Sequence, residues 1–279
     1  MRKFMFKQRF ATASILAFLF ICALMFFSTS TFVSFIMLVV LIAGWEWSDL
    51  AKIESTLGKL CFVLGLLLSM VLIAIYAGIY TEHAYALSYQ ICFASVVLWA
   101  VIFLWLQGYP SSAILWSSKL IMIALGIFLL ASTWLALSSI ISLENGRYLL
   151  LLAVTIIVLA DVGGYVAGNL FGRHKLAPTI SPGKTWEGLL GGLILQGILI
   201  AALMQLLPDV NLPLLCLLVL PVALSSVVGD LFESMLKRHR GVKDSSNLLP
   251  GHGGFLDRLD GVMAALPLFF VILTKASPF

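Results

Sequence analysis

Hydrophobic residues along this chain form long runs that are separated by short polar segments. A bilayer core about 30 Å thick requires roughly 20 apolar residues per helix. The pattern therefore predicts an all-α integral membrane protein, a polytopic bundle of about nine transmembrane helices. The expected spans are residues 11–27, 31–47, 60–80, 88–106, 119–139, 148–168, 188–207, 212–229 and 255–274.

Basic residues fall mainly on one side of this predicted topology. If the N-terminus lies in the cytoplasm, fourteen Lys and Arg side chains face the cytoplasm and only Arg147 and Lys275 face the other side. Cytoplasmic loops of membrane proteins are enriched in these residues. The N-terminus is therefore expected in the cytoplasm. The first apolar run is expected to be an uncleaved span, because residues 28–31 offer no signal-cleavage pattern.

The composition agrees with this class. Hydrophobic residues make up 61% of the chain and charged residues 11%, whereas a soluble domain is roughly 45–50% apolar. Basic and aromatic residues are not interleaved as on a nucleic-acid-binding surface, so no nucleic acid partner is expected. We expect two regions: residues 1–147 with about five spans, and residues 148–279 with about four spans, cytoplasmic loops and the catalytic groups.

Charged residues concentrate in residues 225–261. This segment holds ten of the thirty charged side chains. A charge buried alone in an apolar medium costs several kcal/mol, so the cluster needs water, mutual pairing or a bound ion. A solvated loop is the alternative, but such a loop would not need acids at both helix junctions and four glycines. The segment is therefore interpreted as a site.

Two aspartates begin the last predicted helix. Asp257 and Asp260 are three residues apart, which places both carboxylates on one helical face. Two carboxylates this close repel each other, and a divalent cation relieves that repulsion. No Cys or His cluster accompanies them, so the pattern favours Mg²⁺ or Mn²⁺ over zinc.

The preceding predicted helix presents an acid and bases together. Asp230, Ser234 and either Lys237 or Arg238 fall on one helical face. The glycines that follow allow tight turns through which backbone amides approach an anion. Acids for a metal, several bases and glycine-rich backbone describe a polyphosphate site at a membrane surface. We therefore infer a metal-dependent phosphoryl or nucleotidyl transferase whose substrates are a nucleotide and a lipid.

Asp161 lies about two turns inside the sixth predicted span, where a charge is expensive. We expect its side chain to point into a polar interior, and a structural hydrogen bond to a neighbouring helix is the alternative. Gly164, Gly168 and Gly172 recur every four residues beside it. A second helix backbone is therefore expected to approach closely on that face.

The basic loop at residues 173–188 is a candidate phosphate site. Ser181, Lys184, Thr185 and a new helix N-terminus are expected to bind phosphate there. Its Gly-Lys-Thr resembles the end of a nucleotide-binding P-loop, but Pro178 stands where that motif requires glycine, and no strand is predicted before it. We therefore reject a P-loop. A loop that is basic only because it faces the cytoplasm is the simpler alternative.

The Trp-Glu-Trp-Ser-Asp segment at residues 45–49 ends the second predicted span. Tryptophans gather where membrane helices meet the headgroup layer. We expect an aromatic belt with flanking charge at this position. Support of a lipid headgroup is the alternative.

Several motifs carry a family resemblance. They are SMLKR at residues 234–238, KD at 243–244 and LPGHGGFLDRLD at 249–260, together with FGR at 171–173 and SPGKTWEG at 181–188. With these motifs the chain resembles the phosphatidate cytidylyltransferases, also called CDP-diacylglycerol synthases. The resemblance extends over roughly residues 155–262.

The resemblance implies that CTP and phosphatidic acid react to give CDP-diacylglycerol and pyrophosphate, with Mg²⁺ as cofactor and a second cation left open. It also implies a bacterial cytoplasmic (inner) membrane, an active site that faces the cytoplasm, and contact with membrane lipids. The sequence leaves a homodimer open.

The resemblance also implies roles for individual residues. Metal ligands are expected to be Asp230, Asp257 and Asp260, with Asp161 as a further candidate. Phosphates are expected to be held by Lys184, Lys237, Arg238 and Lys243, and Lys184 is expected to hold those of the nucleotide. Substrates are expected to be bound and oriented by Ser181, Thr185, His252 and Arg258. The catalytic set consists of Asp230, Lys237, Arg238, Lys243, Asp257 and Asp260.

Two other classes fit the residues less well. Enzymes that transfer a phosphoalcohol from a CDP-lipid space further aspartates after an Asp-Gly pair, whereas Asp260 and Gly261 are followed by apolar residues. A cation-coupled transporter would place its polar residues near the middle of the membrane. Here they crowd one surface.

Overall fold

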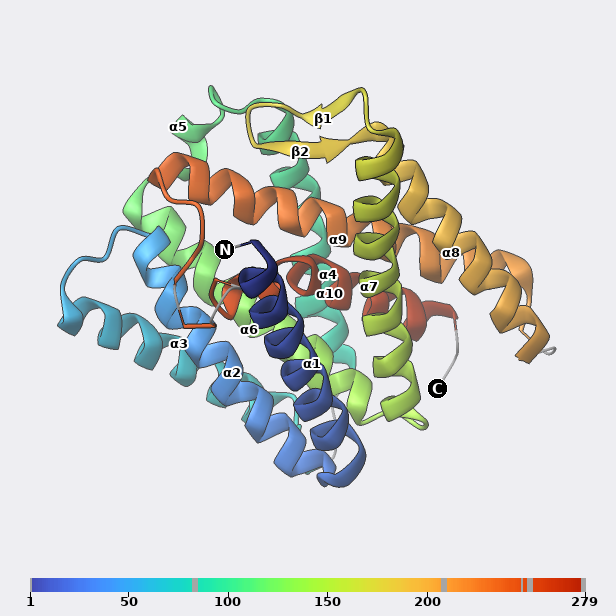
Figure 1. The fold of residues 1–279 in the computed structure, drawn as a ribbon. Coiled ribbons are helices and arrows are strands. Elements are labelled where there is room, and N and C mark those ends of the chain that lie inside the picture. Colours follow the sequence, from blue (N-terminus) through green and yellow to red (C-terminus); the bar gives the residue numbers. More distant parts are fainter. Residues whose placement is uncertain (1, 82–84, 207–209, 247, 250–252, 277–279) are drawn as a thin grey trace.

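A computed structural model gives the fold of the chain (Figure 1) and describes residues 2–81, 85–206, 210–246, 248–249 and 253–276. The elements in order are α1 (Arg2–Phe26), α2 (Thr29–Leu50), α3 (Thr56–Tyr76), α4 (Tyr85–Gln107), α5 (Ala113–Trp116), α6 (Lys119–Ile141), α7 (Gly146–Phe171), β1 (Lys175–Ala177), β2 (Ser181–Thr185), α8 (Trp186–Leu206), α9 (Leu212–Arg240) and α10 (Leu256–Ala276). The predicted mainly helical class is confirmed.

Within the described residues, seven helices are long and apolar enough to cross a membrane, namely α2, α3, α4, α6, α7, α8 and α9. The chain is therefore an integral membrane protein. α1 contains a shorter apolar segment, Ser14–Phe26, and α10 covers the ninth predicted span. Helices thus occupy all nine predicted positions, while a count of nine spans and a cytoplasmic N-terminus stay predictions.

Short polar residues begin several helices, as their capping chemistry predicts. The side chains of Ser28, Ser55, Ser118 and Asn211 each accept a hydrogen bond from a backbone amide in the first turn that follows. Such caps satisfy amides that have no partner within the helix. α9 ends at Gly241, whose φ of 77° lies in the left-handed region that favours glycine.

α6 lies at the centre of the bundle. Every residue from Leu129 to Ile141 is buried, and the helix packs against α2, α3, α4, α7 and α10. α7 packs along α8, and α9 packs along α10 and crosses the upright α7 (Figure 1). α6 therefore joins the N-terminal helices to α7 and α10, whereas α8 contacts α7, α9 and β2.

Glycines set the contact between α7 and α8, which confirms the predicted close approach. A methyl group at Gly168 would lie 3.3 Å from Thr185 Oγ1 and 3.7 Å from the Cα of Gly188. One at Gly163 would lie 2.6 Å from the carbonyl oxygen of Gly191. Larger side chains at these positions would push the two helices apart.

The basic loop contains a hairpin that was not predicted. β1 and β2 pair antiparallel, with Lys175 opposite Thr185. Both strands are short, and their sequences lack the apolar alternation that identifies a strand. The Gly-Lys-Thr sequence lies within β2 and runs directly into α8. The expectation that no strand precedes the Gly-Lys-Thr is therefore wrong, because β1 does. The rejection of a P-loop stands on Pro178, which occupies the position where that motif requires glycine.

The predicted aromatic belt at residues 45–49 is wrong for its central residues. Glu46, Trp47 and Ser48 are fully buried. Trp47 Nε1 donates a hydrogen bond to the carbonyl oxygen of Met122, at 2.8 Å. The end of α2 is enclosed by α6, α9 and α10 instead of meeting lipid headgroups.

Candidate active site

Two glycines bring α9 and α10 together at the centre of the site. A methyl group at Gly229 would overlap the carbonyl oxygen of Asp260 and lie 3.1 Å from the Cα of Gly261. One at Gly261 would lie 3.3 Å from the carbonyl oxygen of Ser226. The backbones therefore almost touch, and Asp230 and Asp260, each next to one of these glycines, become neighbours.

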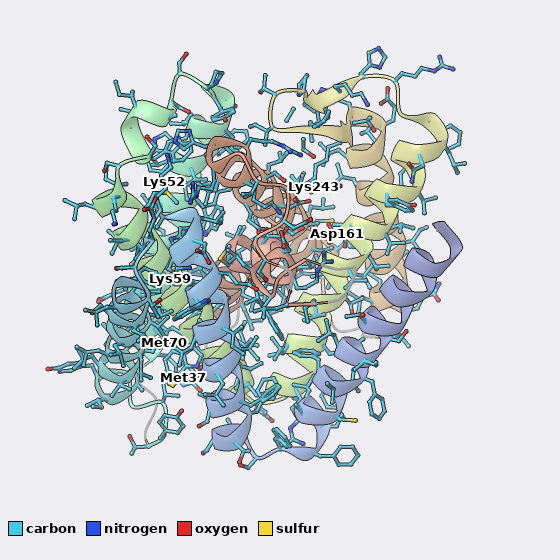
Figure 2. All side chains as sticks on the ribbon, turned by 60° about the vertical axis from the view of Figure 1, so that its left-hand side comes forward. Met37, Lys52, Lys59, Met70, Asp161 and Lys243 are labelled. Atoms are coloured by element: carbon cyan, nitrogen blue, oxygen red, sulfur yellow. The ribbon has the colours of Figure 1, made fainter. Side chains whose placement is uncertain are left out.

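Carboxylates from three helices line one cavity of about 440 Å³. Asp161 comes from α7, Asp230 from α9, and Asp257 and Asp260 from α10. We call this space the acidic cavity; its other charged lining residues are Lys237, Asp244 and Arg258. Figure 2 labels Asp161, which lies towards the middle of the molecule in that view. The structure thus gathers acids that are separated by up to about a hundred residues.

Asp257 is held by the chain itself. Its Oδ2 accepts hydrogen bonds from Ser245 N at 2.9 Å, Ser245 Oγ at 2.8 Å and Gly254 N at 2.8 Å. Its Oδ1 accepts from Lys237 Nζ at 2.5 Å. The Asp257 carboxylate therefore anchors the connection between α9 and α10. Asp230 and Asp260 have fewer hydrogen-bond partners in the protein than Asp257 has.

Lys237 lies between two acids. Its ammonium is 2.5 Å from Asp257 Oδ1 and 3.4 Å from Oε1 of Glu233, one turn earlier on α9. Glu233 is fully buried. The Lys237 ammonium therefore offsets the negative charge of two carboxylates in a region with little access to water.

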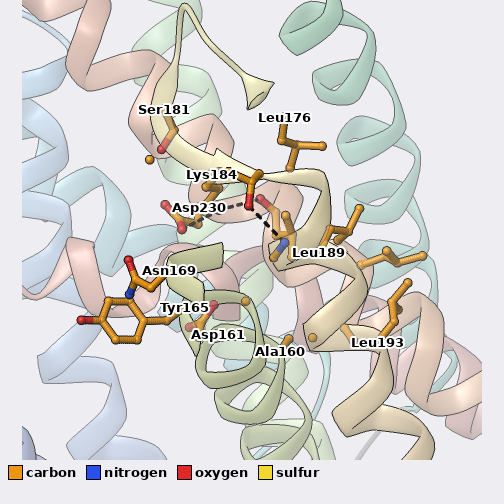
Figure 3. A pocket seen from close by; sticks show the side chains of 18 residues that line it. Ala160, Asp161, Tyr165, Asn169, Leu176, Ser181, Lys184, Leu189, Leu193 and Asp230 are labelled. Atoms are coloured by element: carbon orange, nitrogen blue, oxygen red, sulfur yellow. Dashed lines mark hydrogen bonds and ion pairs between the residues drawn. The ribbon is translucent and has the colours of Figure 1, made fainter. Parts of the chain in front are cut away.

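A second cavity of about 430 Å³ lies beside the first (Figure 3). Its polar lining includes Ser181 and Lys184 from the hairpin and Tyr165 and Asn169 from α7. α8 and α9 supply most of its apolar wall, namely Leu189, Leu193, Ala223, Leu224 and Val227, and Leu176 of β1 and Ala160 of α7 add to it. We call this space the amphipathic cavity.

The two cavities share a wall. Asp161 and Asp230 line both of them. On the amphipathic side, Lys184 Nζ lies 2.6 Å from Asp230 Oδ2, and Figure 3 marks this ion pair. The Lys184 ammonium thus lies on the amphipathic side of Asp230, and the other carboxylates lie on the side of the acidic cavity.

Other predicted substrate residues have structural partners. Thr185 is buried, and its hydroxyl oxygen accepts the amide of Gly188 at 3.1 Å, which caps α8. Arg238 Nε donates to the carbonyl oxygen of Ile180 at 3.2 Å and so ties the hairpin to α9. Arg238 and Lys243, both among the described residues, line neither cavity. His252 lies outside the described residues.

The hairpin is also tied to the start of α8. Glu187 accepts hydrogen bonds from the amides of Arg173 and His174, and its Oε1 lies 2.6 Å from His174 Nδ1. These contacts fix the loop that carries Lys184 relative to α7 and α8.

The donor set of the acidic cavity suits a hard cation such as Mg²⁺. Asp161, Asp230 and Asp260 supply only oxygen atoms, and their like charges repel without a cation between them. Within the described residues, no three acidic, histidine or cysteine side chains lie close enough together to form a complete metal site. Mg²⁺ commonly takes one or two carboxylates and completes its shell with water and substrate phosphate. The cavity therefore fits a cation that arrives with a polyphosphate.

Sequence reasoning missed several residues of the site. Glu233, Ser245, Tyr165 and Asn169 contact or line the cavities, and of these Glu233 and Ser245 lay within the segment that the charge pattern marked. Glu46 was assigned to a membrane interface, yet it accepts hydrogen bonds from the start of α10. A glutamate between two tryptophans in an apolar span was the available signal.

Comparison with known proteins shows which family has sequences similar to this chain. A sequence model described as the cytidylyltransferase family matches residues 7–275. A Pseudomonas aeruginosa protein named phosphatidate cytidylyltransferase is 37% identical over 277 residues, covering 98% of both chains. A Haemophilus influenzae protein of the same name is 35% identical over 285 residues, covering 95% of this chain and 97% of its own. A Staphylococcus saprophyticus protein of that name is 47% identical over 134 residues, covering 47% of this chain and 51% of its own.

Proposed function

Because this chain belongs to the cytidylyltransferase family, we propose that it transfers the cytidylyl group of CTP to phosphatidate, which yields CDP-diacylglycerol and pyrophosphate. Two relatives that match almost its whole length carry the name phosphatidate cytidylyltransferase. The predicted family is confirmed, and the reaction agrees with the nucleotide and lipid substrates inferred from the residues.

The observation that carries this proposal is the pair of cavities that share Asp161 and Asp230. A transferase that joins a nucleotide to a lipid phosphate needs two sites whose phosphates meet. The amphipathic cavity, with Lys184 at its polar end and leucines along its wall, suits a lipid phosphate and the start of its acyl chains. The acidic cavity suits the triphosphate of a nucleotide with its cation.

In this arrangement a phosphate oxygen of phosphatidate attacks the α-phosphorus of CTP. The new P–O bond forms as the bond from the α-phosphorus to the β-phosphate oxygen breaks, and pyrophosphate leaves opposite the attacking oxygen. The attacking phosphate monoester is already ionised near neutral pH, so no general base is needed. The chain contributes position and charge: Lys184 holds the attacking phosphate, and Lys237 and Arg258 face the triphosphate.

Asp230 and Asp260, which the close contact between α9 and α10 makes neighbours, would hold Mg²⁺ in the acidic cavity together with substrate phosphate, and Asp161 is a further candidate ligand. When bound, this cation neutralises charge on the triphosphate and stabilises the leaving pyrophosphate. Asp257 acts differently from the sequence-based assignment, because its oxygens are already used by Lys237, Ser245 and Gly254. In this proposal Asp257 fixes the start of α10, which carries Asp260.

The proposed activity has a direct test. Purified protein in detergent micelles should release pyrophosphate from CTP only when phosphatidate is present, and a lipid product containing cytidine should accumulate at the same rate. Diacylglycerol, which lacks the attacking phosphate, is the matched control and should give no product. Release of pyrophosphate without lipid, or with diacylglycerol, would contradict the proposal.

Lys184→Ala should raise the KM for phosphatidate by about tenfold and change the KM for CTP by less than threefold. The reason is that one charge-assisted contact to phosphate contributes roughly 1.5 kcal/mol. The measurement is initial rate against each substrate in mixed micelles. From the sequence alone this loop was expected to hold phosphates of the nucleotide. A selective rise in the KM for CTP would restore that assignment and reverse the roles of the two cavities.

We also propose that the site faces the cytoplasm of a bacterial inner membrane. In a variant without Cys22, Cys61, Cys92 and Cys216, a cysteine at the exposed position Val242 should resist a membrane-impermeant thiol reagent in intact spheroplasts and react after permeabilisation. The control is Glu144→Cys, also exposed, in the turn between α6 and α7, which should react without permeabilisation. The reverse pattern would invert the topology.

A further inference from the structure

Glu46 is a buried carboxylate far from the proposed reacting groups in sequence but close to them in space. It lies on α2 and is fully buried. Its Oε2 accepts a hydrogen bond from Leu256 N at 2.7 Å, and it shares the hydroxyl proton of Ser245, whose Oγ lies at 3.2 Å, with Asp257 Oδ2. Its Oε1 accepts from Ser246 Oγ at 2.5 Å and Phe255 N at 3.1 Å. These four donors lie about 200 residues further along the chain.

Two of these donors are the backbone amides at the start of α10. The first amides of a helix have no partner within the helix, and a negative charge placed there is stabilised by the helix dipole. Such a cap normally comes from a residue just before the helix. Here α2 supplies it. All four donors are uncharged, so the amides and hydroxyls themselves stabilise the buried carboxylate.

Ser245 connects Glu46 to the acidic cavity. Its hydroxyl lies 3.2 Å from Glu46 Oε2 and 2.8 Å from Asp257 Oδ2. A methyl group at Gly254 would overlap both the Glu46 carboxylate and Ser245 Oγ. Glu46, Ser245 and Asp257 thus form one network packed against glycine backbone, and Lys237 adjoins it through Asp257.

The end of α2 is itself firmly placed. Trp47, the next residue, donates a hydrogen bond to the carbonyl oxygen of Met122 on α6 at 2.8 Å and packs against Phe232 of α9. The carbonyl oxygen of Asp49 accepts a hydrogen bond from Arg240 Nε at 3.1 Å. Contacts of Trp47 and Asp49, which follow Glu46, therefore fix the end of α2 relative to α6 and α9.

We infer that Glu46 is a positioning residue for cytidylyl transfer: from α2 it caps α10 and so sets the place of Asp257 and Asp260 in the acidic cavity. This gives the N-terminal helices a part in the chemistry. Within the described residues, Glu46 accepts hydrogen bonds from Ser245, Ser246, Phe255 and Leu256, and none of these four lines the acidic cavity. Its effect on the reaction is therefore indirect, through the position of α10.

The test compares Glu46→Gln with the parent protein. A glutamine has the same shape, but its NH₂ group cannot accept a hydrogen bond, so the backbone amide on that side, Phe255 N or Leu256 N, loses its acceptor. We expect kcat to fall roughly 10- to 100-fold, as for supporting residues around metal sites, with the KM for phosphatidate within about twofold. The Mg²⁺ concentration needed for half-maximal rate should rise. Glu46→Asp, which keeps the charge, should recover part of the rate.

Hydrogen exchange supplies a readout that is independent of activity. The amides of Phe255 and Leu256 should exchange faster in Glu46→Gln, while those of α3 should not change. Asp49→Asn is the matched control on the same helix, since its side chain is 47% exposed and pairs with Lys59. This variant should keep the exchange rates, kcat and Mg²⁺ dependence of the parent.

A folded Glu46→Gln protein with parental kcat, Mg²⁺ dependence and exchange at the start of α10 would overturn the inference. If Glu46→Gln does not fold, Ser246→Ala removes one donor from the same carboxylate and is judged by the same three measurements. The inference rests on the proposed activity, but the two fail differently. A parent protein that makes no lipid-linked cytidine refutes the activity, whereas an active parent and an equally active Glu46→Gln refute only the role of Glu46.

Discussion

Replacing Asp260 by asparagine is expected to slow turnover by 10²- to 10³-fold while leaving the protein folded. The amide keeps the side-chain shape and the Oδ1 that accepts the amide of Gly261 at 2.7 Å, but it removes the charge that would hold the cation. A loss of this size corresponds to about 3 to 4 kcal/mol of transition-state stabilisation. Raising the Mg²⁺ concentration should restore part of the rate, because mass action offsets weaker binding. The measurement is turnover against Mg²⁺ concentration, with the melting temperature of each protein.

Asp257→Asn is the informative comparison on the same helix. Asp257 accepts hydrogen bonds from Ser245, Gly254 and Lys237, so its neutralisation should lower the melting temperature as well as the rate. Added Mg²⁺ should not restore this variant, because the lost charge serves the protein and not the cation. If Asp260→Asn keeps near-normal activity, Asp260 is no metal ligand. If both variants respond equally to Mg²⁺, the distinction drawn between the two acids is wrong.

The sequence could predict that the acids of α9 and α10 gather in one place, because the signals for this are local. Asp257 and Asp260 lie within one helical turn, and Asp230 and Lys237 lie two turns apart on one helix, so spacing alone places them together. Apolar runs of sufficient length located the helices for the same reason. The glycines of α7 likewise predicted a close helix contact, since the absence of a side chain is visible in the sequence.

The remaining features depend on which helices meet. The link from Glu46 to α10 joins residues about 200 positions apart, and no spacing rule indicates such a pair. The hairpin that carries Lys184 has strands of three and five residues, too short for a periodic pattern. The proposed difference in role between Asp257, which fixes the start of α10, and Asp260, which would hold the cation, also needed the structure. The spacing alone does not distinguish the two acids.

The contact between α9 and α10 leads to the second large effect. Gly229→Ala should lower stability by about 1 to 3 kcal/mol, the usual cost of overpacking a tight interface. The added methyl group would overlap the carbonyl oxygen of Asp260 and lie 3.1 Å from the Cα of Gly261. Because backbone atoms cannot rotate away, the helices must separate, which moves Asp230 away from Asp260.

The matched control for this variant is Gly197→Ala. Gly197 lies on α8, is exposed, and has nothing within 4 Å of an added methyl group. There the exchange should stabilise the helix by up to about 1 kcal/mol. The melting temperature should therefore fall in Gly229→Ala and hold or rise in Gly197→Ala, and turnover at a temperature where both proteins are folded should drop only in the former. Equal turnover in the two variants would show that the acidic cavity tolerates a wider spacing of α9 and α10, and that the approach at Gly229 serves packing alone.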